Sequence, residues 1–136
     1  MFRSSIAVLL VACSIAVACG GDDDSGTPTS EAARRGVGSA CKADTDCTEA
    51  GQVCLTDFKG GMCGIADCTM TSECPTGSVC VGDPDLARNF CLLVCIDKPD
   101  CNVHRSIDEE ANCTSTLNQI DAKTGMDPKV CQPPVG

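Results

Sequence analysis

Cysteine is the residue type whose number and spacing in this chain could do chemistry. The 136 residues include fourteen cysteines, and twelve of these lie between positions 41 and 131. Closely spaced cysteines can ligate a metal, run thiol redox chemistry, or pair as disulfides that stabilise a small domain. The stretches DCTEAGQVC, from Asp46, and ECPTGSVC, from Glu73, repeat one pattern: an acidic residue, a cysteine, a glycine and a valine–cysteine pair.

The cysteine spacing argues against a metal site and against redox catalysis. Structural zinc sites use pairs from C-x2-C to C-x4-C together with a second pair or histidines, and redox or haem-attachment motifs need C-x-x-C. The chain has no C-x-x-C, and the closer pairs, Cys63/Cys68 and Cys91/Cys95, only join consecutive repeats. The one histidine, His104, lies among charged residues, so we expect it to be exposed. We predict no metal and no cofactor.

Pairs of carboxylates are the other candidates for catalysis. A glycosidase holds such a pair in a deep cleft of a substantial scaffold, and this short, loop-rich chain has little material for one. We therefore expect solvated acidic loops and no enzyme activity. A weak surface calcium site stays open, although no segment matches the EF-hand pattern. The carboxylate groups considered are Asp44/Asp46, Asp83/Asp85, Asp97/Asp100 and Asp108–Glu110.

Disulfides are the remaining use of the cysteines, and the composition favours them. The chain has no Trp, no Tyr and only three Phe, and aromatic side chains usually supply much of a core. Small exported domains that cannot build a sufficient core use disulfides instead. We predict a small disulfide-rich, loop-dominated fold with short β-hairpins, built from tandem four-cysteine modules without a large hydrophobic core.

The twelve cysteines divide into three modules: residues 41–63, residues 64–91, and a divergent third module, residues 92–136. Each set of four opens with C-x5-C, has an acidic residue before its second cysteine and an apolar residue before its fourth. Four cysteines allow three pairings within a module. Among these we favour first to third and second to fourth. That choice predicts Cys41–Cys54, Cys47–Cys63, Cys68–Cys80, Cys74–Cys91, Cys95–Cys113 and Cys101–Cys131.

Regular secondary structure is expected to be sparse. Gly51 and Gly77 each stand three residues before the third cysteine of their modules and predict tight turns, because glycine adopts positive φ without strain. The segments VCL and VCV predict short strands that pair with GGMC and RNFC, and DPDLAR, residues 83–88, predicts a hairpin loop. The helix candidates are a turn capped by Ser106 within residues 106–113, and residues 115–123.

The first residues have the pattern of an export signal. Residues 1–18 contain Arg3 and an apolar stretch too short to span a bilayer comfortably. Small residues before Cys19, and glycine and aspartate after it, resemble the lipobox of bacterial lipoproteins. That resemblance implies a lipoprotein signal peptide over residues 1–18 and acylation of Cys19, for example with palmitate. Cys13 is the alternative lipidated residue, and plain signal-peptidase cleavage is a third interpretation.

Residues 19–40 predict a flexible tether, because this Gly/Ser/Thr-rich segment has almost no large apolar residues. Cleavage before Cys19 removes only Arg3 among the charged residues, so nine basic and nineteen acidic residues leave a net charge of −10. Such an acidic chain is not expected to bind nucleic acid.

The module pattern, C-x5-C followed after two or three residues by Gly-x-Val-Cys, resembles the Dickkopf N-terminal cysteine-rich type, and more loosely EGF-like and EB-type modules. The whole chain resembles small cysteine-rich bacterial lipoproteins with such repeats. The resemblance implies an extracellular, disulfide-bonded, non-catalytic class that binds a partner. The residues that carry it are Cys41, Cys47, Gly51, Cys54 and Cys63, and again Cys68, Cys74, Gly77, Cys80 and Cys91.

These observations predict a lipid-anchored extracytoplasmic binding or interaction protein of the cell envelope, at the outer membrane or the cell surface. Its partners would be the membrane, through the anchor, and an unknown protein or surface ligand. The binding surface is expected on the loops Leu55–Gly61 and Gly82–Asn89 and on the insertions of the third module. The alternatives are a structural envelope or surface-coat component and a disulfide-loop enzyme inhibitor.

Overall fold

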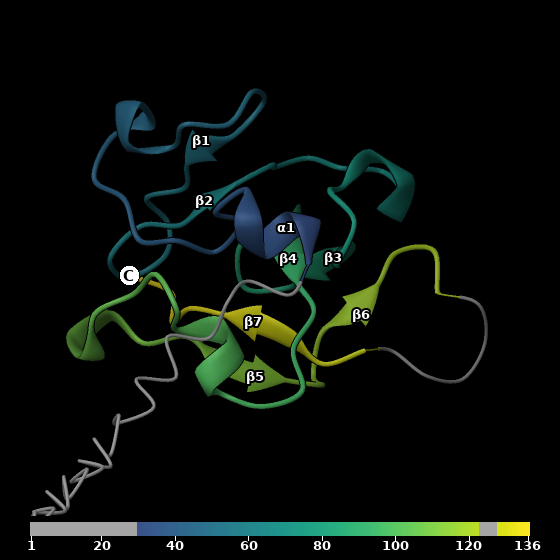
Figure 1. The fold of residues 1–136 in the computed structure, drawn as a ribbon. Helices are drawn as coiled ribbons and strands as arrows, with labels where there is room; N and C mark the ends of the chain where they lie inside the picture. The colour runs from purple at the N-terminus through teal and green to yellow at the C-terminus, as the bar shows by residue number, and fades with distance from the viewer. Residues whose placement is uncertain (1–29, 123–127) are drawn as a thin grey trace, which may run out of the picture.

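The computed structural model describes residues 30–122 and 128–136, and within them the predicted small, disulfide-rich, loop-dominated fold is confirmed (Figure 1). The predicted signal peptide, Cys13, Cys19 and the start of the predicted tether lie outside the described residues. The regular elements are one helical turn, α1 (Glu31–Arg34), four 3-10 turns (Asp44–Asp46, Thr71–Glu73, Pro99–Cys101 and Ile107–Glu109), and the strands β1 (Val53–Cys54), β2 (Cys63–Gly64), β3 (Ser78–Asp83), β4 (Arg88–Leu93), β5 (Asn112–Thr114), β6 (Asn118–Gln119) and β7 (Val130–Gln132).

The first two modules each contain the predicted hairpin. Strands β1 and β2 pair antiparallel, and β3 and β4 pair over their full lengths, with the predicted loop between them. Gly51 and Gly77 precede β1 and β3 with φ of 83° and 95°, values that glycine adopts far more readily than other residues. The two repeats therefore enter their hairpins through the same kind of turn.

The twelve cysteines of the modules form six disulfides, and these follow the favoured order of first to third and second to fourth. In every module the third cysteine lies directly across a strand pair from the fourth, for example Cys80 opposite Cys91. Paired strands thus present both cysteines side by side, where the first two cysteines can reach them.

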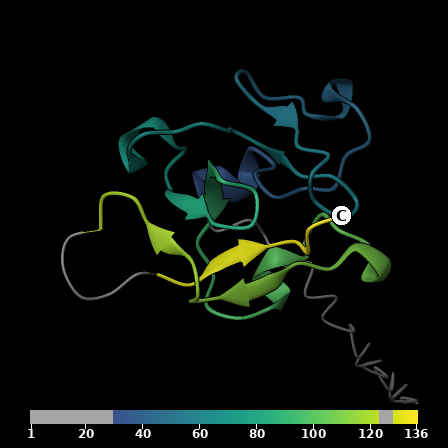
Figure 2. The same cartoon turned by 180° about the vertical axis from the view of Figure 1, so that it is seen from behind.

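The third module reaches across the molecule to its neighbour. Strands β5 and β7 form its own antiparallel pair, seen from both sides in Figures 1 and 2. Its insertion supplies β6, which adds to β3 and gives the sheet order β4-β3-β6. The helix predicted over residues 115–123 is therefore wrong in its described part, because Leu117 is buried in the core and Gln119 pairs with Val81.

All three modules share one small core. Its centre is the pair Phe58 and Phe90, two of the three phenylalanines of the chain, whose rings meet edge to face at 5.2 Å. An isolated module could not bury these side chains, because aromatic rings need partners on several sides. The core joins residues of module one (Leu55, Phe58, Met62), module two (Val79, Val81, Phe90, Leu92) and module three (Leu117, Val130).

The predicted flexible tether over residues 19–40 is wrong from Ser30 onward. The Ser30 hydroxyl caps α1 by accepting a hydrogen bond from the amide of Ala33, a favourable arrangement at a helix start. Ala32 and Val37 are buried in a second cluster with Leu93 and several cysteines. Two small apolar residues are enough here, because the disulfide-linked modules already provide the surface that receives them.

The acidic residue before each second cysteine closes a turn, a role that its repetition alone did not reveal. Asp46 accepts hydrogen bonds from the amides of residues 42 and 43, and Asp100 from those of residues 96 and 97. Glu73 accepts from the amide and hydroxyl of Thr69. The turn predicted after Ser106 also forms, as a 3-10 turn whose N-cap has no side-chain hydrogen bond to the backbone.

Candidate binding site

The loop Leu55–Gly61, predicted to bind a partner, is mainly an internal contact. Leu55 and Phe58 are buried in the core, and the loop backbone pairs with the C-terminal residues: the amide of Lys59 donates to the carbonyl of Pro134 at 2.7 Å. An isolated β-bridge also joins Phe58 to Val135. The loop's larger apolar side chains and much of its backbone are therefore unavailable to a ligand.

Arg105 fastens this loop to the rest of the molecule, although nothing in the sequence distinguishes it. Its side chain is 9% exposed, and its guanidinium donates to four backbone carbonyls, those of Gly38, Lys59, Gly61 and Glu109. Burial lowers the pKa of Arg105, but an arginine stays charged in proteins. The hydrogen-bond partners of this buried guanidinium are therefore carbonyl oxygens rather than a paired carboxylate.

Two other predicted binding segments do come together. The turn of the β3–β4 hairpin and residues 116–120 of the third module's insertion line one hollow of about 490 Å³. Sheet pairing explains the meeting, because β6 lies against β3 although the insertion is remote in sequence. Its lining combines amides and a hydroxyl (Asn89, Asn118, Gln119, Thr116) with aliphatic side chains (Pro84, Ala87, Leu117, Ile120).

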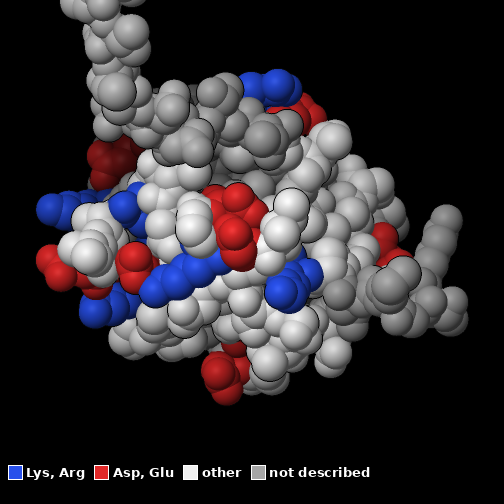
Figure 3. All heavy atoms as spheres, turned by 60° about the horizontal axis from the view of Figure 1, so that its bottom comes forward, with Lys and Arg blue, Asp and Glu red and all other residues white. Residues whose placement is uncertain are grey.

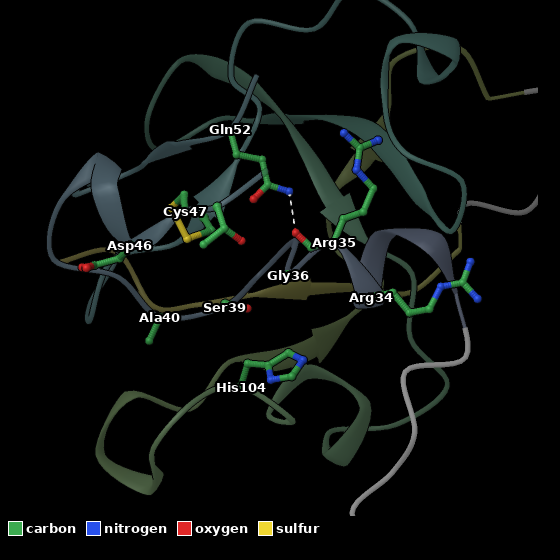
Figure 4. A pocket seen from close by; sticks show the side chains of 11 residues that line it. Arg34, Arg35, Gly36, Ser39, Ala40, Asp46, Cys47, Gln52 and His104 are labelled. Atoms are coloured by element: carbon green, nitrogen blue, oxygen red, sulfur yellow. Dashed lines mark hydrogen bonds between the residues drawn. A yellow bond between two sulfur atoms is a disulfide. The ribbon is translucent and has the colours of Figure 1, made fainter. Parts of the chain in front are cut away.

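A second hollow, of about 320 Å³, lies between α1, module one and His104 (Figure 4). Gln52, which is 7% exposed, spans part of it and donates to the carbonyl of Arg35 at 2.9 Å. Figure 4 shows the guanidinium groups of Arg34 and Arg35 at one side, extended away from His104. Arg35 also lies 3.6 Å from both Glu31 and Glu49. These basic groups do not converge on one ligand position.

Catalytic chemistry finds little support in either hollow. His104 is exposed, as predicted, and its ring makes no hydrogen bond to a nucleophile among residues 30–122 and 128–136. The cysteine sulfurs that lie within 4.8 Å of one another, such as those of Cys41, Cys47 and Cys63, all belong to disulfides. A disulfide sulfur lacks the thiolate charge that metal ligation and nucleophilic attack require.

On the face drawn in Figure 3, charged side chains are mixed rather than gathered by sign. Figure 3 shows basic and acidic groups adjacent to one another on a largely uncharged face. The best-formed ion pair is Arg88 with Asp67, where two hydrogen bonds of 3.1 and 2.9 Å hold the pKa of Asp67 below its usual range. The face drawn in Figure 3 gives a phosphate backbone no continuous basic patch.

Comparisons with known proteins identify no relative: no family model, no curated protein and no solved structure matches the chain. The resemblances in cysteine spacing therefore stay predictions. Within residues 30–122 and 128–136, no helix has the length and apolar character needed to cross a membrane.

Proposed function

We propose that this chain is a lipid-anchored extracytoplasmic protein of the cell envelope that binds a partner and has no catalytic activity. The observation that carries the proposal is the combination of an export-type sequence pattern over residues 1–18, directly before Cys19, with a body held by six disulfides. Disulfides persist in oxidising compartments outside the cytosol, so the leader and the body favour the same destination.

The binding role is supported by the way the scaffold presents its loops. The β3–β4 turn and the insertion residues 116–120, which line one hollow, extend from modules that each contain two disulfides. Binding residues are often found on loops that a rigid framework positions. The chain from the proposed anchor at Cys19 to Ser30, the first described residue, would reach at most roughly 40 Å when fully extended.

Lipid attachment is tested by expressing the full chain in a bacterial host with labelled palmitate. We expect the wild type and Cys13→Ala to carry label, and Cys19→Ala to lose it. Label that persists in Cys19→Ala and disappears in Cys13→Ala would move the anchor to Cys13. An unlabelled wild type would contradict the lipid-anchored proposal, whichever cysteine is considered.

Binding is tested with a photo-crosslinking amino acid at Ala87, an exposed residue of the β3–β4 turn that lines the hollow, and at Ser72, an exposed residue outside it. In native envelopes we expect a discrete adduct from position 87 and none from position 72. An adduct between copies of this chain would favour the surface-coat alternative, and an adduct with a hydrolase the inhibitor alternative. Equal labelling from both positions would refute a binding face at the hollow.

A further inference from the structure

The outer face of the β4-β3-β6 sheet is covered at one end and open at the other. Side chains alternate between the two faces of a strand; Val79 and Val81 of β3 point to the core, so Ser78, Cys80 and Gly82 point outward. The residues around α1 cover the Ser78 end, where Leu93 packs with Ala32 and Val37. Disulfides of Cys80 and Cys91 cover the middle.

The uncovered end is a row of two asparagines with a glycine between them. Gly82 lies opposite Asn89 on β4 and opposite Asn118 on β6, and residues directly opposite share a face of the sheet. Gly82 is not among the positive-φ glycines, so the backbone does not require glycine here. Glycine instead lets its neighbours approach the strand closely: a Cβ at this position would lie 3.3 Å from Ile120 Cδ1 and 3.5 Å from Asn89 Oδ1, so Ile120 would have to move to admit it.

The polar groups of this hollow suit an uncharged partner. Asn89 uses its Nδ2 to donate to the carbonyl of Cys68 at 3.0 Å, which leaves its Oδ1 as an acceptor. Asn118 is exposed and offers both a donor and an acceptor. The charged residues of the lining are already engaged: Asp83 accepts from Gln132 and two backbone amides, and Arg88 is held by Asp67.

We propose that the hollow at Gly82 binds a backbone peptide group of a polypeptide partner. The amide N–H donates to Asn89 Oδ1, its carbonyl accepts from the Asn118 amide, and its neighbouring carbons contact Ile120, Ala87 and Pro84. This proposal deepens the proposed function, on which it rests, by naming the partner's chemistry. The lining residues include no aromatic ring for stacking on a sugar and no unpaired cation for a phosphate.

The probe for this site is N-methylacetamide, which contains one peptide group, titrated into the purified full chain in neutral detergent. We expect saturable NMR shifts confined to Gly82 and to the side-chain amides of Asn89 and Asn118. A dissociation constant of about 10–100 mM is reasonable for so few atoms. N,N-dimethylacetamide, which has no N–H, and acetate, which is charged, should each bind at least about fivefold more weakly.

Three variants make the test specific. Gly82→Ala should weaken binding at least about fivefold by filling the hollow, and Ile120, which is 44% exposed, can move to admit the methyl group. Asn118→Ala should weaken it similarly and keeps the test valid if Gly82→Ala does not fold. Ser115→Ala, outside the lining, should bind like the wild type.

Shifts spread over the surface, equal shifts with N,N-dimethylacetamide, or unchanged binding by Gly82→Ala and Asn118→Ala would overturn the site. Palmitate labelling does not depend on this hollow, so the lipid-anchor proposal and the amide site can fail separately.

Discussion

At the scale of single residues, a few polar side chains form hydrogen bonds with backbone groups that lie far apart in the sequence. Arg105 binds carbonyls of the N-terminal segment, module one and its own module. Asp121 binds the amide and hydroxyl of Thr71, which attaches the third module's insertion to module two. Such contacts connect modules that have no covalent link except the chain itself.

Replacing Arg105 should loosen the contact between modules. Arg105→Lys keeps the charge, but one ammonium group cannot reach four separate carbonyls, so buried acceptors lose partners. We expect a loss of about 2–4 kcal/mol in the free energy of unfolding, measured by urea denaturation without reductant. The exposed Arg34→Lys should change it by less than about 0.5 kcal/mol. Equal effects of the two substitutions would refute the role given to Arg105.

The acidic residues that close the 3-10 turns should make these turns sensitive to acid. Hydrogen bonds from backbone amides, mainly that of Lys42 for Asp46 and that of Thr69 for Glu73, lower the pKa of each carboxyl below its ordinary value of 3.8 or 4.5. A pKa lowered in the folded state means that the stabilisation is present above the ordinary value and is lost as the pH falls through the lowered one.

NMR titration of the amide protons of Lys42 and Thr69 measures this directly. We expect their midpoints below 3.8 and 4.5 respectively. In Asp46→Asn the Lys42 amide should show no such transition, while that of Thr69 keeps its own. Midpoints at or above the ordinary values would mean that the turns do not stabilise the ionised carboxyls.

At the scale of elements, the repeat determines most of what the sequence could predict. Cysteine order and the glycine turns before β1 and β3 predicted both hairpins, because these features act locally. The helical turn α1 and strand β6 were not predicted, because both depend on distant surfaces. Ala32 is buried in a cluster that includes Leu93, and Gln119 pairs with Val81.

Alanine substitutions of the two repeated glycines, Gly51 and Gly77, should differ in their effect on the start of α1. This difference tests the packing of α1 against the turn at Gly77. Both have positive φ, so each substitution strains the turn by about 1 kcal/mol or more. A Cβ at Gly51 meets nothing within 4 Å, whereas a Cβ at Gly77 would lie 2.3 Å from Ser30 Cβ. Gly77→Ala should therefore also displace the start of α1, at its cap.

Limited trypsin digestion reports this displacement, because Arg34 and Arg35 are cleavage positions at the end of α1. Cleavage there should be faster in Gly77→Ala than in the wild type, and nearly unchanged in Gly51→Ala. Equal acceleration in both variants would show that turn strain, rather than contact with Ser30, controls the segment.

At the scale of the whole molecule, disulfides and a small shared core replace the large core that the composition excludes. The sequence predicted tandem modules but not their contacts: Phe58 and Phe90 meet across the boundary between the first two, and Val135 returns to module one. The hollow at Gly82 also needs residues of two modules. Neither arrangement could be predicted from cysteine spacing, which specifies the bonds within a module and not the packing between modules.

The central claim is an exported, acylated chain whose remaining cysteines are all paired. Intact mass of the full chain, purified from membranes and alkylated before and after reduction, tests it most directly. We predict that Cys19 is the acylated N-terminus, that no alkyl group is added before reduction, and that twelve are added after it, two for each disulfide. An unacylated chain, or alkylation of several cysteines before reduction, would contradict the account.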